Sequence, residues 1–341
     1  MIFTELCYRV PALRAAMAMI SISCLLCLSP VAAQPADTPA PRADYPNRPL
    51  RFVVPFPPGG SNDIIARAVV GRLAEDLRQS VVVDNRGGAN GIIGTDLTAK
   101  SPPDGHTFLI VGNGFAINPH VYRKLPYHAE RDFAPVSLVG YGGFVLVVHP
   151  SIAARNVNDL IALAKASPGK FTMASAGVGN MAHLSGELFM SLTGTRFVHV
   201  PYKGGAPAMT ELLGGQVALY FSTVIVALPH IRAGKLRALA VTGSRRASVT
   251  PELPTIAEAG FPGGQFDFWV GMLAPAKTPR EIVGRINSEI NRSQQTADVK
   301  ARLAKLGADP MPMNPDQFDA YIADEASVLQ KIMRAAGAKP N

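Results

Sequence analysis

Four glycine-rich loops constrain the possible fold of this chain more than any other feature. Each loop follows a predicted β-strand and leads into a predicted helix. They lie at 57–61, 85–91, 175–180 and 202–206. Short β-branched runs alternate with amphipathic stretches, which is typical of an α/β fold with a largely parallel sheet. Parallel sheets bind ligands at the carboxyl ends of their strands, so we expect these loops to converge on one cleft.

The first loop reads Pro-Pro-Gly-Gly-Ser and joins a predicted strand at 50–54 to a predicted helix at 63–78. Glycine lets a ligand approach the backbone, and the first N–H groups of a helix carry partial positive charge. The loop is therefore a candidate site for a carboxylate or phosphate. We expect Ser61 or Asn62 to cap the helix. Taken singly, each loop could equally be an ordinary strand-turn-helix corner.

The predicted elements extend along the chain in the same alternation. Further predicted strands lie at 80–84, 107–111, 144–148, 172–175, 197–200, 219–221, 236–241 and 271–274. Further predicted helices lie at 92–99, 157–166, 183–192, 206–213, 224–232, 280–294 and 297–306.

Residues 1–33 have the pattern of a secretory signal peptide. Arg9 and Arg14 supply a basic start, residues 15–28 an apolar run, and Val31-Ala32-Ala33 the small residues of a cleavage site. The apolar run is too short for a membrane span. The pattern predicts export to the periplasm.

All the cysteines, Cys7, Cys24 and Cys27, precede the expected cleavage site. The exported chain would therefore have neither disulfides nor thiol chemistry. A lipoprotein anchor at Cys24 is the alternative, although Ser21-Ile22-Ser23 is a poor lipobox. Residues 34–44 are rich in Pro and Ala and are predicted to form a flexible tether.

Composition indicates a globular protein that favours anionic partners. The net charge is +8, with 48% hydrophobic and 17% charged residues. Roughly 300 residues after the leader are enough for two domains. The basic residues are scattered and no nucleic-acid-binding motif is present, so we expect no nucleic-acid partner.

Other site chemistries lack their motifs in this sequence. No Gly-x-Ser-x-Gly elbow is present, and Ser185 would lie on a different helix face from His183. The histidines have no metal-binding spacing, and there is neither a dinucleotide fingerprint nor a P-loop. We therefore expect no enzyme, no catalytic residues, no metal and no cofactor; a secreted hydrolase is the remaining enzymatic alternative.

An ordered set of motifs resembles the Bug family of periplasmic solute receptors, also called tripartite tricarboxylate transporter receptors. The resemblance extends from about Tyr45 to the C-terminus, and the order carries it rather than any single motif. The motifs include VPFPPGG at 54–60, NRGGANG at 85–91, PDGHT at 103–107, HVPYKG at 199–204, LLGGQV at 212–217, GKLRALAVT at 234–242, PTIAEAG at 254–260 and WVGMLAP at 269–275.

The resemblance implies a type II periplasmic binding protein fold, with two α/β domains around a ligand cleft and a two-strand hinge. Domain 1 would combine 45–146 with 271–341, and domain 2 would be 147–270. Such a monomeric receptor would close around a small organic carboxylate and present it to a tripartite tricarboxylate-type membrane transporter. A receptor that feeds a membrane signalling kinase is the alternative.

The resemblance also implies the ligand-binding residues. Domain 1 would supply Phe56, Gly60, Ser61, Asp63, Ala89, Gly91 and Asn113. Domain 2 would supply Ser175, Gly177, Asn180, His183, Tyr202, Lys203 and Ser222. Three of these side chains could instead have a structural role: Asp63 could cap its own helix, His183 could pack or cap, and Lys203 could be a solvated surface charge.

The sequence departs from the family pattern at Ala218 and Ser222, where members commonly carry acidic residues. A carboxylate at position 222 could pair with the amine of an amino-acid ligand. Its absence predicts a preference for plain mono- or dicarboxylates over aspartate or glutamate.

Overall fold

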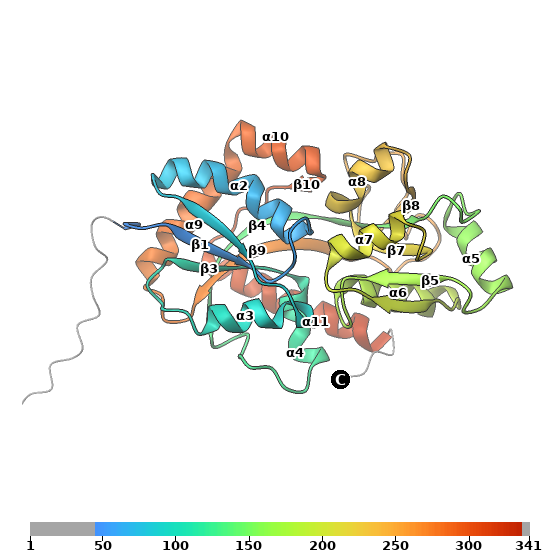
Figure 1. The fold of residues 1–341 in the computed structure, drawn as a ribbon, viewed down its shortest axis with the longest axis horizontal. Helices are drawn as coiled ribbons and strands as arrows, with labels where there is room; N and C mark the ends of the chain where they lie inside the picture. The colour runs from blue at the N-terminus through green and yellow to red at the C-terminus, as the bar shows by residue number, and fades with distance from the viewer. Residues whose placement is uncertain (1–44, 336–341) are drawn as a thin grey trace, which may run out of the picture. The chain divides into compact units, whose positions relative to one another are not determined.

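The computed structural model describes residues 45–335; the predicted signal peptide, the tether and the alternative lipoprotein anchor lie outside the described residues. Within that range, a mixed β-sheet is flanked by helices (Figure 1). The strands are β1 (Leu50–Val54), β2 (Val81–Asn85), β3 (Thr107–Gly112), β4 (Phe133–Val148), β5 (Thr172–Ser175), β6 (Val198–Pro201), β7 (Leu219–Thr223), β8 (Arg237–Val241), β9 (Asp267–Pro275) and β10 (Ala308–Asp309).

Helices follow most of the strands. They are α2 (Ser61–Leu77), the 3-10 turn η1 (Ala89–Gly91), α3 (Ile92–Ala99), α4 (Asn113–Val121), α5 (Val157–Ala166), α6 (Met181–Thr193), α7 (Gly205–Leu213), α8 (Val224–Arg232), α9 (Arg280–Gln295), α10 (Ala297–Leu306) and α11 (Pro315–Ala335). Among residues 45–335, no helix combines the length and apolarity that crossing a bilayer requires.

The sheet contains two parallel groups of strands joined by antiparallel ones. Its order is β2-β1-β3-β9-β4-β7-β5-β6, and β8 and β10 also pair with β4. β1 is parallel to β2 and β3, and β5 is parallel to β6 and β7. β9 and β4 lie antiparallel between the two groups. The predicted α/β class is confirmed.

Strand β4 connects the two groups. Residues 133–143 pair with β9, and residues 144–148 pair with β7 and β8. Along its last part, Val145 and Val147 contact one hydrophobic core, whereas Leu146 and Val148 contact another. This alternation follows from the two-residue period of a strand. The expected domain boundaries, near residues 147 and 270, fall on β4 and β9 and stay a prediction.

In the first parallel group, helices cover both faces of the strands. Phe52 and Val53 of β1 are fully buried, and α2 buries Ile65, Val69 and Leu73 against the sheet. The helices α2 and α3 lie on opposite faces (Figure 1), as right-handed crossovers to strands on either side require. The predicted loops leave the carboxyl ends of their strands, which places them at one edge of each group.

The start of α2 corrects the predicted cap. Its N-cap is Gly60, not Ser61 or Asn62, and Gly60 makes no side-chain capping bond. Instead, Asp63 Oδ2 accepts the Gly59 N–H at 3.0 Å. A carboxylate from inside the helix thus satisfies the loop backbone, so a capping hydroxyl or amide is not needed there.

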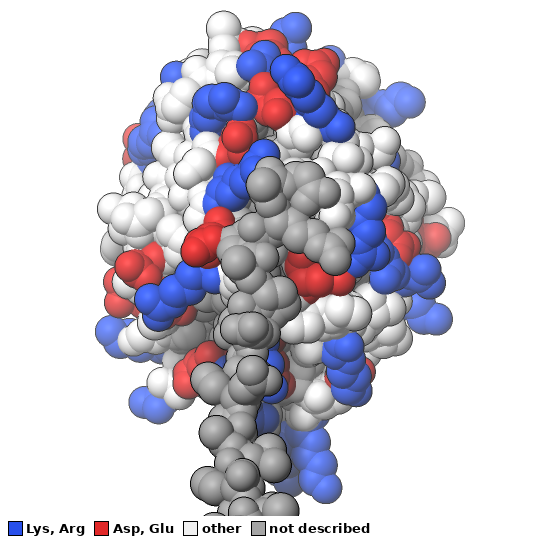
Figure 2. All heavy atoms as spheres, turned by 90° about the vertical axis from the view of Figure 1, so that its left-hand side faces the viewer, with Lys and Arg blue, Asp and Glu red and all other residues white. Residues whose placement is uncertain are grey.

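Charged side chains of both signs are mixed on the face shown in Figure 2. Surface ion pairs among the described residues include Arg48 with Asp104 and Lys100 with Asp96. On this face, the basic residues do not form the single-sign patch that nucleic-acid binding would use.

Candidate ligand-binding site

Helix N-termini from both parallel groups of the sheet surround one cavity of about 80 Å³, here called the inner cavity. The first residues or N-caps of α2, α4, α6, α7 and α8 line it. Most of its lining residues belong to these five helix starts or are aromatic, and Asn90 comes from η1. The lining residues are Phe56, Gly60, Ser61, Asn62, Asn90, Gly112, Asn113, Gly114, Phe144, Ala176, Asn180, Met181, Ala182, Gly205, Tyr220, Thr223, Val226 and Phe268.

None of the residues that line the inner cavity is charged. Its electrostatic character therefore comes from helix N-termini, each of which carries about half a positive charge. The N-caps Gly60, Gly112, Gly204 and Thr223 make no side-chain capping bonds, whereas Asn180 accepts the His183 N–H. Backbone N–H groups at most of these helix starts are thus not occupied by side-chain caps, and such groups bind anions well.

A second cavity, of about 280 Å³ and here called the outer cavity, shares Phe56, Asn90 and Ala176 with the first. It lies between the second, third and fourth glycine-rich loops. Its remaining lining residues are Gly88, Ala89, Gly91, Tyr122, Gly177, Val178, Pro201, Tyr202 and Lys203. Lys203 is the one charged side chain of this lining.

The predicted site residues divide between these cavities and their surroundings. Phe56, Gly60, Ser61, Asn113 and Asn180 line the inner cavity. Phe56 also lines the outer cavity, together with Ala89, Gly91, Gly177, Tyr202 and Lys203. Asp63, Ser175, His183 and Ser222 line neither cavity.

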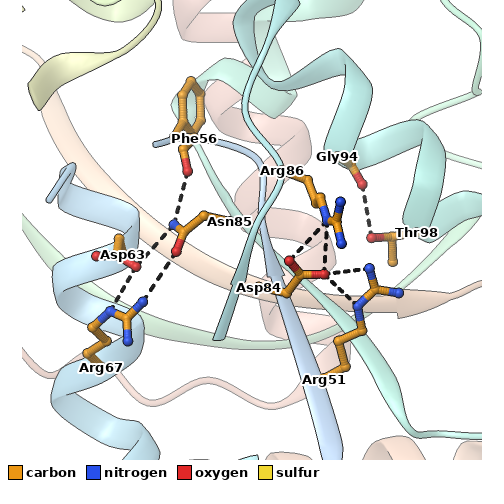
Figure 3. Close-up of polar contacts among 9 residues, drawn as sticks. All are labelled: Arg51, Phe56, Asp63, Arg67, Asp84, Asn85, Arg86, Gly94 and Thr98. Carbon is orange, nitrogen blue, oxygen red and sulfur yellow. Dashed lines mark hydrogen bonds and ion pairs between the residues drawn. The ribbon is translucent and has the colours of Figure 1, made fainter. Parts of the chain in front are cut away.

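Asp63 lies behind the first loop and is buried (Figure 3). Its carboxylate accepts bonds from Gly59 N, from Arg67 Nε at 2.9 Å and from Asn85 Nδ2 at 3.1 Å. Asn85 Nδ2 also donates to the Phe56 carbonyl at 3.0 Å. Asp63 and Asn85 together therefore hold both ends of the loop that presents Gly60 and Ser61 to the inner cavity.

His183 and Ser175 support the third loop in a similar way. His183 Nδ1 accepts the Gly179 N–H at 3.1 Å, and its ring stacks on His199 with centroids 3.9 Å apart. Ser175 Oγ lies 2.6 Å from His199 Nε2 and accepts the Gly177 N–H. Burial, together with the neighbouring His183, lowers the pKa of His199 to about 4. His199 is therefore neutral near pH 7.

Ser222 is fully buried in β7, where its hydroxyl donates to the Thr223 carbonyl. The next residue, Thr223, is the one that lines the inner cavity. The Ser222 side chain is therefore not part of the cavity wall, although the next residue in the sequence is.

Asn113 offers its backbone rather than its side chain to the inner cavity. Its Nδ2 donates to the Asp267 carbonyl at 3.0 Å and to Glu325 Oε2 at 3.3 Å. Its Oδ1 accepts the Trp269 N–H at 3.4 Å. Burial raises the pKa of Glu325, and the nearby Asp267 raises it further. Both ends of the Asn113 side-chain amide are therefore occupied. Helix α4 contributes its first backbone N–H groups to the inner cavity instead.

Two asparagines that sequence reasoning missed as site residues line the inner cavity, and each has one unpaired amide atom. Asn62 is 6% exposed, and its Nδ2 has no hydrogen-bond partner among the described residues. Asn90 Oδ1 is also buried and without such a partner. Asn90 stands inside the second predicted loop, next to Gly91, and Asn62 directly follows the first predicted loop, so position in or beside a loop was the available signal.

Among the described residues, no group of three or more His, Cys, Asp or Glu side chains is arranged to hold a metal ion. The polar groups of the two cavities are amides, hydroxyls, backbone N–H groups and one ammonium. That set suits an anionic organic molecule better than a cation.

Comparison with known proteins decides the family. A family model described as the tripartite tricarboxylate transporter family receptor matches residues 65–338. The chain belongs to this family. BugT of Bordetella pertussis is 42% identical over 297 residues, which cover 86% of this chain and 91% of BugT.

Solved structures agree with this membership. An R. palustris protein with adipate matches with a TM-score of 0.85 and 36% identity, covering 87% of this chain and 100% of its own. The periplasmic binding protein BugD matches with a TM-score of 0.84 and 32% identity, with the same coverage. The predicted Bug-family receptor with a two-domain periplasmic binding protein fold is confirmed: the chain is a solute-binding protein, not an enzyme, and membership implies a periplasmic location.

Proposed function

We propose that this Bug-family receptor binds a small organic carboxylate in the inner cavity and presents it to a tripartite tricarboxylate-type membrane transporter. The observation that carries the proposal is the set of helix N-termini around an uncharged cavity. Such N-termini stabilise an anion without a counter-charged side chain. The related R. palustris protein with adipate, a dicarboxylate, supports the choice of ligand class.

In this proposal some of the predicted site residues contact the ligand and others act indirectly. Gly60, Ser61, Asn113 and Asn180 contribute helix-start groups around one carboxylate, and the outer-cavity residues contact the remainder of the ligand. The latter are Ala89, Gly91, Gly177, Tyr202 and Lys203. Asp63, Ser175 and His183 act indirectly by holding the loops, and Ser222 acts only through the position of β7.

Hinge closure is the proposed way in which the ligand becomes buried. The two lobes would be residues 45–146 with 271–335, and residues 147–270, joined by β4 and β9. Loops of opposite lobes already lie against one another: Tyr122 Oη donates to the Val178 carbonyl at 3.3 Å. A Cβ atom on Gly204 would lie 2.8 Å from Pro57 Cδ. These contacts support closure that buries a ligand between the loops.

The receptor should also discriminate against amino acids. No carboxylate lines the inner cavity, so an ammonium group there would be desolvated without a counter-charge and repelled by the helix N-termini. The proposed preference for plain carboxylates over amino acids thus depends on the whole uncharged lining rather than on Ser222.

Calorimetric titration of the purified protein tests the ligand class. We expect glutarate and adipate to bind, and glutarate to bind at least about tenfold more tightly than glutamate, because an unpaired buried charge is costly. The thermal midpoint should rise with the bound ligand. Tighter binding of glutamate, or no binding of any carboxylate in a panel of aliphatic and aromatic acids, would contradict the proposal.

The transport role needs a cellular test, because a receptor for a signalling kinase would bind ligand in the same way. We expect that deleting the gene lowers uptake of the labelled ligand found by calorimetry. Unchanged uptake with a changed transcriptional response would favour sensing instead. The test concerns the exported protein, from which we propose that residues 1–33 are removed as a signal peptide.

A further inference from the structure

Asn90 presents a hydrogen-bond acceptor to a site that otherwise consists mainly of donors. Its Oδ1 atom is buried and has no hydrogen-bond partner among the described residues. Asn90 lines both the inner and the outer cavity, so it stands where the two meet. A carboxylate ligand offers only acceptors and cannot satisfy this atom.

The orientation of the Asn90 amide follows from its neighbours. Asn118 Nδ2 donates to the Asn90 carbonyl at 3.2 Å and lies 3.3 Å from Tyr127 Oη. The other end of the Asn118 amide is therefore its oxygen, which accepts from Asn90 Nδ2 at 2.9 Å. Turning the Asn90 amide would bring two oxygens together, so Oδ1 must point away from Asn118.

Asn90 Oδ1 lies beside the third loop. Asn90 has φ 52°, a left-handed conformation that asparagine and glycine tolerate best. A Cβ atom built on Gly177, in the third loop, would lie 3.6 Å from Asn90 Oδ1. The acceptor thus lies next to the third loop, on a residue that the linings of the two cavities share.

We infer that Asn90 selects carboxylates that carry a hydroxyl group, with the hydroxyl donating to Asn90 Oδ1. The inference rests on the proposed function, because it assumes that a carboxylate occupies the inner cavity. Asn62 lines the same cavity and has an unpaired Nδ2, so it is the matching donor for that carboxylate. A hydroxyl fits better than an ammonium group because the surrounding helix N-termini disfavour a cation.

The physical basis is the cost of leaving a buried acceptor unpaired. A site built to bond a ligand hydroxyl rejects the analogue that lacks it, because the acceptor is desolvated without a replacement bond. We expect a preference of about tenfold or more for the hydroxylated member of a matched ligand pair.

Calorimetry on matched pairs tests the inference with the full protein. The pairs are malate with succinate, 2-hydroxyglutarate with glutarate, and 3-hydroxybutyrate with butyrate, using both enantiomers of each hydroxy acid. In the wild type, the hydroxylated member of the best-binding pair should bind about tenfold more tightly. Asn90→Gly keeps the left-handed backbone and removes the acceptor, so the ratio of the two affinities should fall below about twofold.

Asn62→Ala is the matched control. It removes an amide from the same cavity, but one that donates to the carboxylate, so both members of a pair should weaken by a similar factor and the preference should remain. Equal binding of both members by the wild type would overturn the inference while the proposed function stands; it would mean that water satisfies Asn90.

Two further outcomes are decisive. A preference that persists in Asn90→Gly would also overturn the inference, because another group would then recognise the hydroxyl. If no carboxylate binds the wild type, the proposed function fails and the inference fails with it. The wild-type comparison stands by itself if the glycine variant does not fold.

Discussion

Asp63 is the residue on which the geometry of the first loop depends. It is 3% exposed and contacts the loop backbone at Gly59, its own helix at Arg67, and β2 at Asn85. Because Asn85 also bonds the Phe56 carbonyl, one network fixes the loop before any ligand arrives. Preorganisation of this kind improves binding by reducing the entropy lost when the ligand is ordered in its site.

Replacing this carboxylate should therefore affect both stability and binding. In Asp63→Asn, the amide cannot accept all three bonds, and the charge that strengthens them is lost. We expect a loss of about 1–3 kcal/mol in the free energy of unfolding, measured in urea, and weaker carboxylate binding. Asp96→Asn is the control, since Asp96 pairs at the same helical spacing with the exposed Lys100. Its cost should stay below about 0.5 kcal/mol. Equal urea midpoints for the two variants would refute the role of Asp63.

At the scale of elements, loops from the two parallel groups meet where a side chain would not fit. A Cβ atom on Gly179, which leads into α6, would lie 2.4 Å from Val121 Cγ1 at the end of α4. Gly179 also has φ 76°. Position 179 thus requires glycine for two reasons: its positive φ and the close approach of Val121. Only the close approach concerns closure of the two lobes.

A matched glycine separates the two reasons. Gly169 has φ 75°, but nothing lies within 4 Å of its Cβ position. Both Gly179→Ala and Gly169→Ala should therefore cost about 1–2 kcal/mol of backbone strain. Only Gly179→Ala should also weaken ligand binding, by about tenfold, because it blocks closure. Adding Val121→Ala should recover most of that affinity. Equal affinities for the two single variants would exclude closure at this contact.

Local chemistry predicted many elements closely. The predicted helices at 92–99 and 224–232, and the strand at 172–175, have the bounds seen in the structure. The first part of β4 was missed because Pro135 and glycines usually interrupt strands. Helix α4 was missed because it contains Pro119. Helix α11 was also absent from the predicted helices, although the sequence marks its start. Asn314 and Gln317 have the spacing of a capping box and exchange capping bonds.

The candidate site was less predictable, because its members depend on partners distant in sequence. The glycine-rich loops indicated a common cleft, but the orientation of Asn90 depends on Asn118, and the Asn113 side chain is occupied by Glu325 on the last helix. No local pattern states which end of an amide is already bonded. The predicted contributions of individual residues therefore stay predictions, although the loops themselves surround the two cavities.

At the scale of the whole molecule, His199 links stability to pH. Burial lowers its pKa from 6.5 to about 4 in the folded state. Between these values the unfolded chain binds more protons, so this group's contribution to stability rises with pH and is lost as pH falls from 6.5 toward 4. His183 and Ser175 contact the His199 ring directly. Glu187 contacts His183 on the same helix and so lies one residue further away.

The expected measurement is the urea midpoint between pH 4 and pH 7. His199→Gln keeps a group that can bond Ser175 but cannot titrate, so its midpoint should rise less steeply with pH than that of the wild type. His128→Gln, at an exposed position, should leave the wild-type profile unchanged. An unaltered slope in His199→Gln would show that other groups carry the pH dependence.

The uncharged inner cavity has an evolutionary consequence. In the proposed function, its attraction for anions would reside in main-chain N–H groups, which every amino acid except proline supplies. Mutation of the wall would then alter the shape and polarity of the pocket while the proposed affinity for a carboxylate is inherited almost unchanged. A gene duplicate could drift to a new metabolite through a few substitutions without first losing the ability to bind acids. Such a scaffold favours diversification into many receptors of differing selectivity.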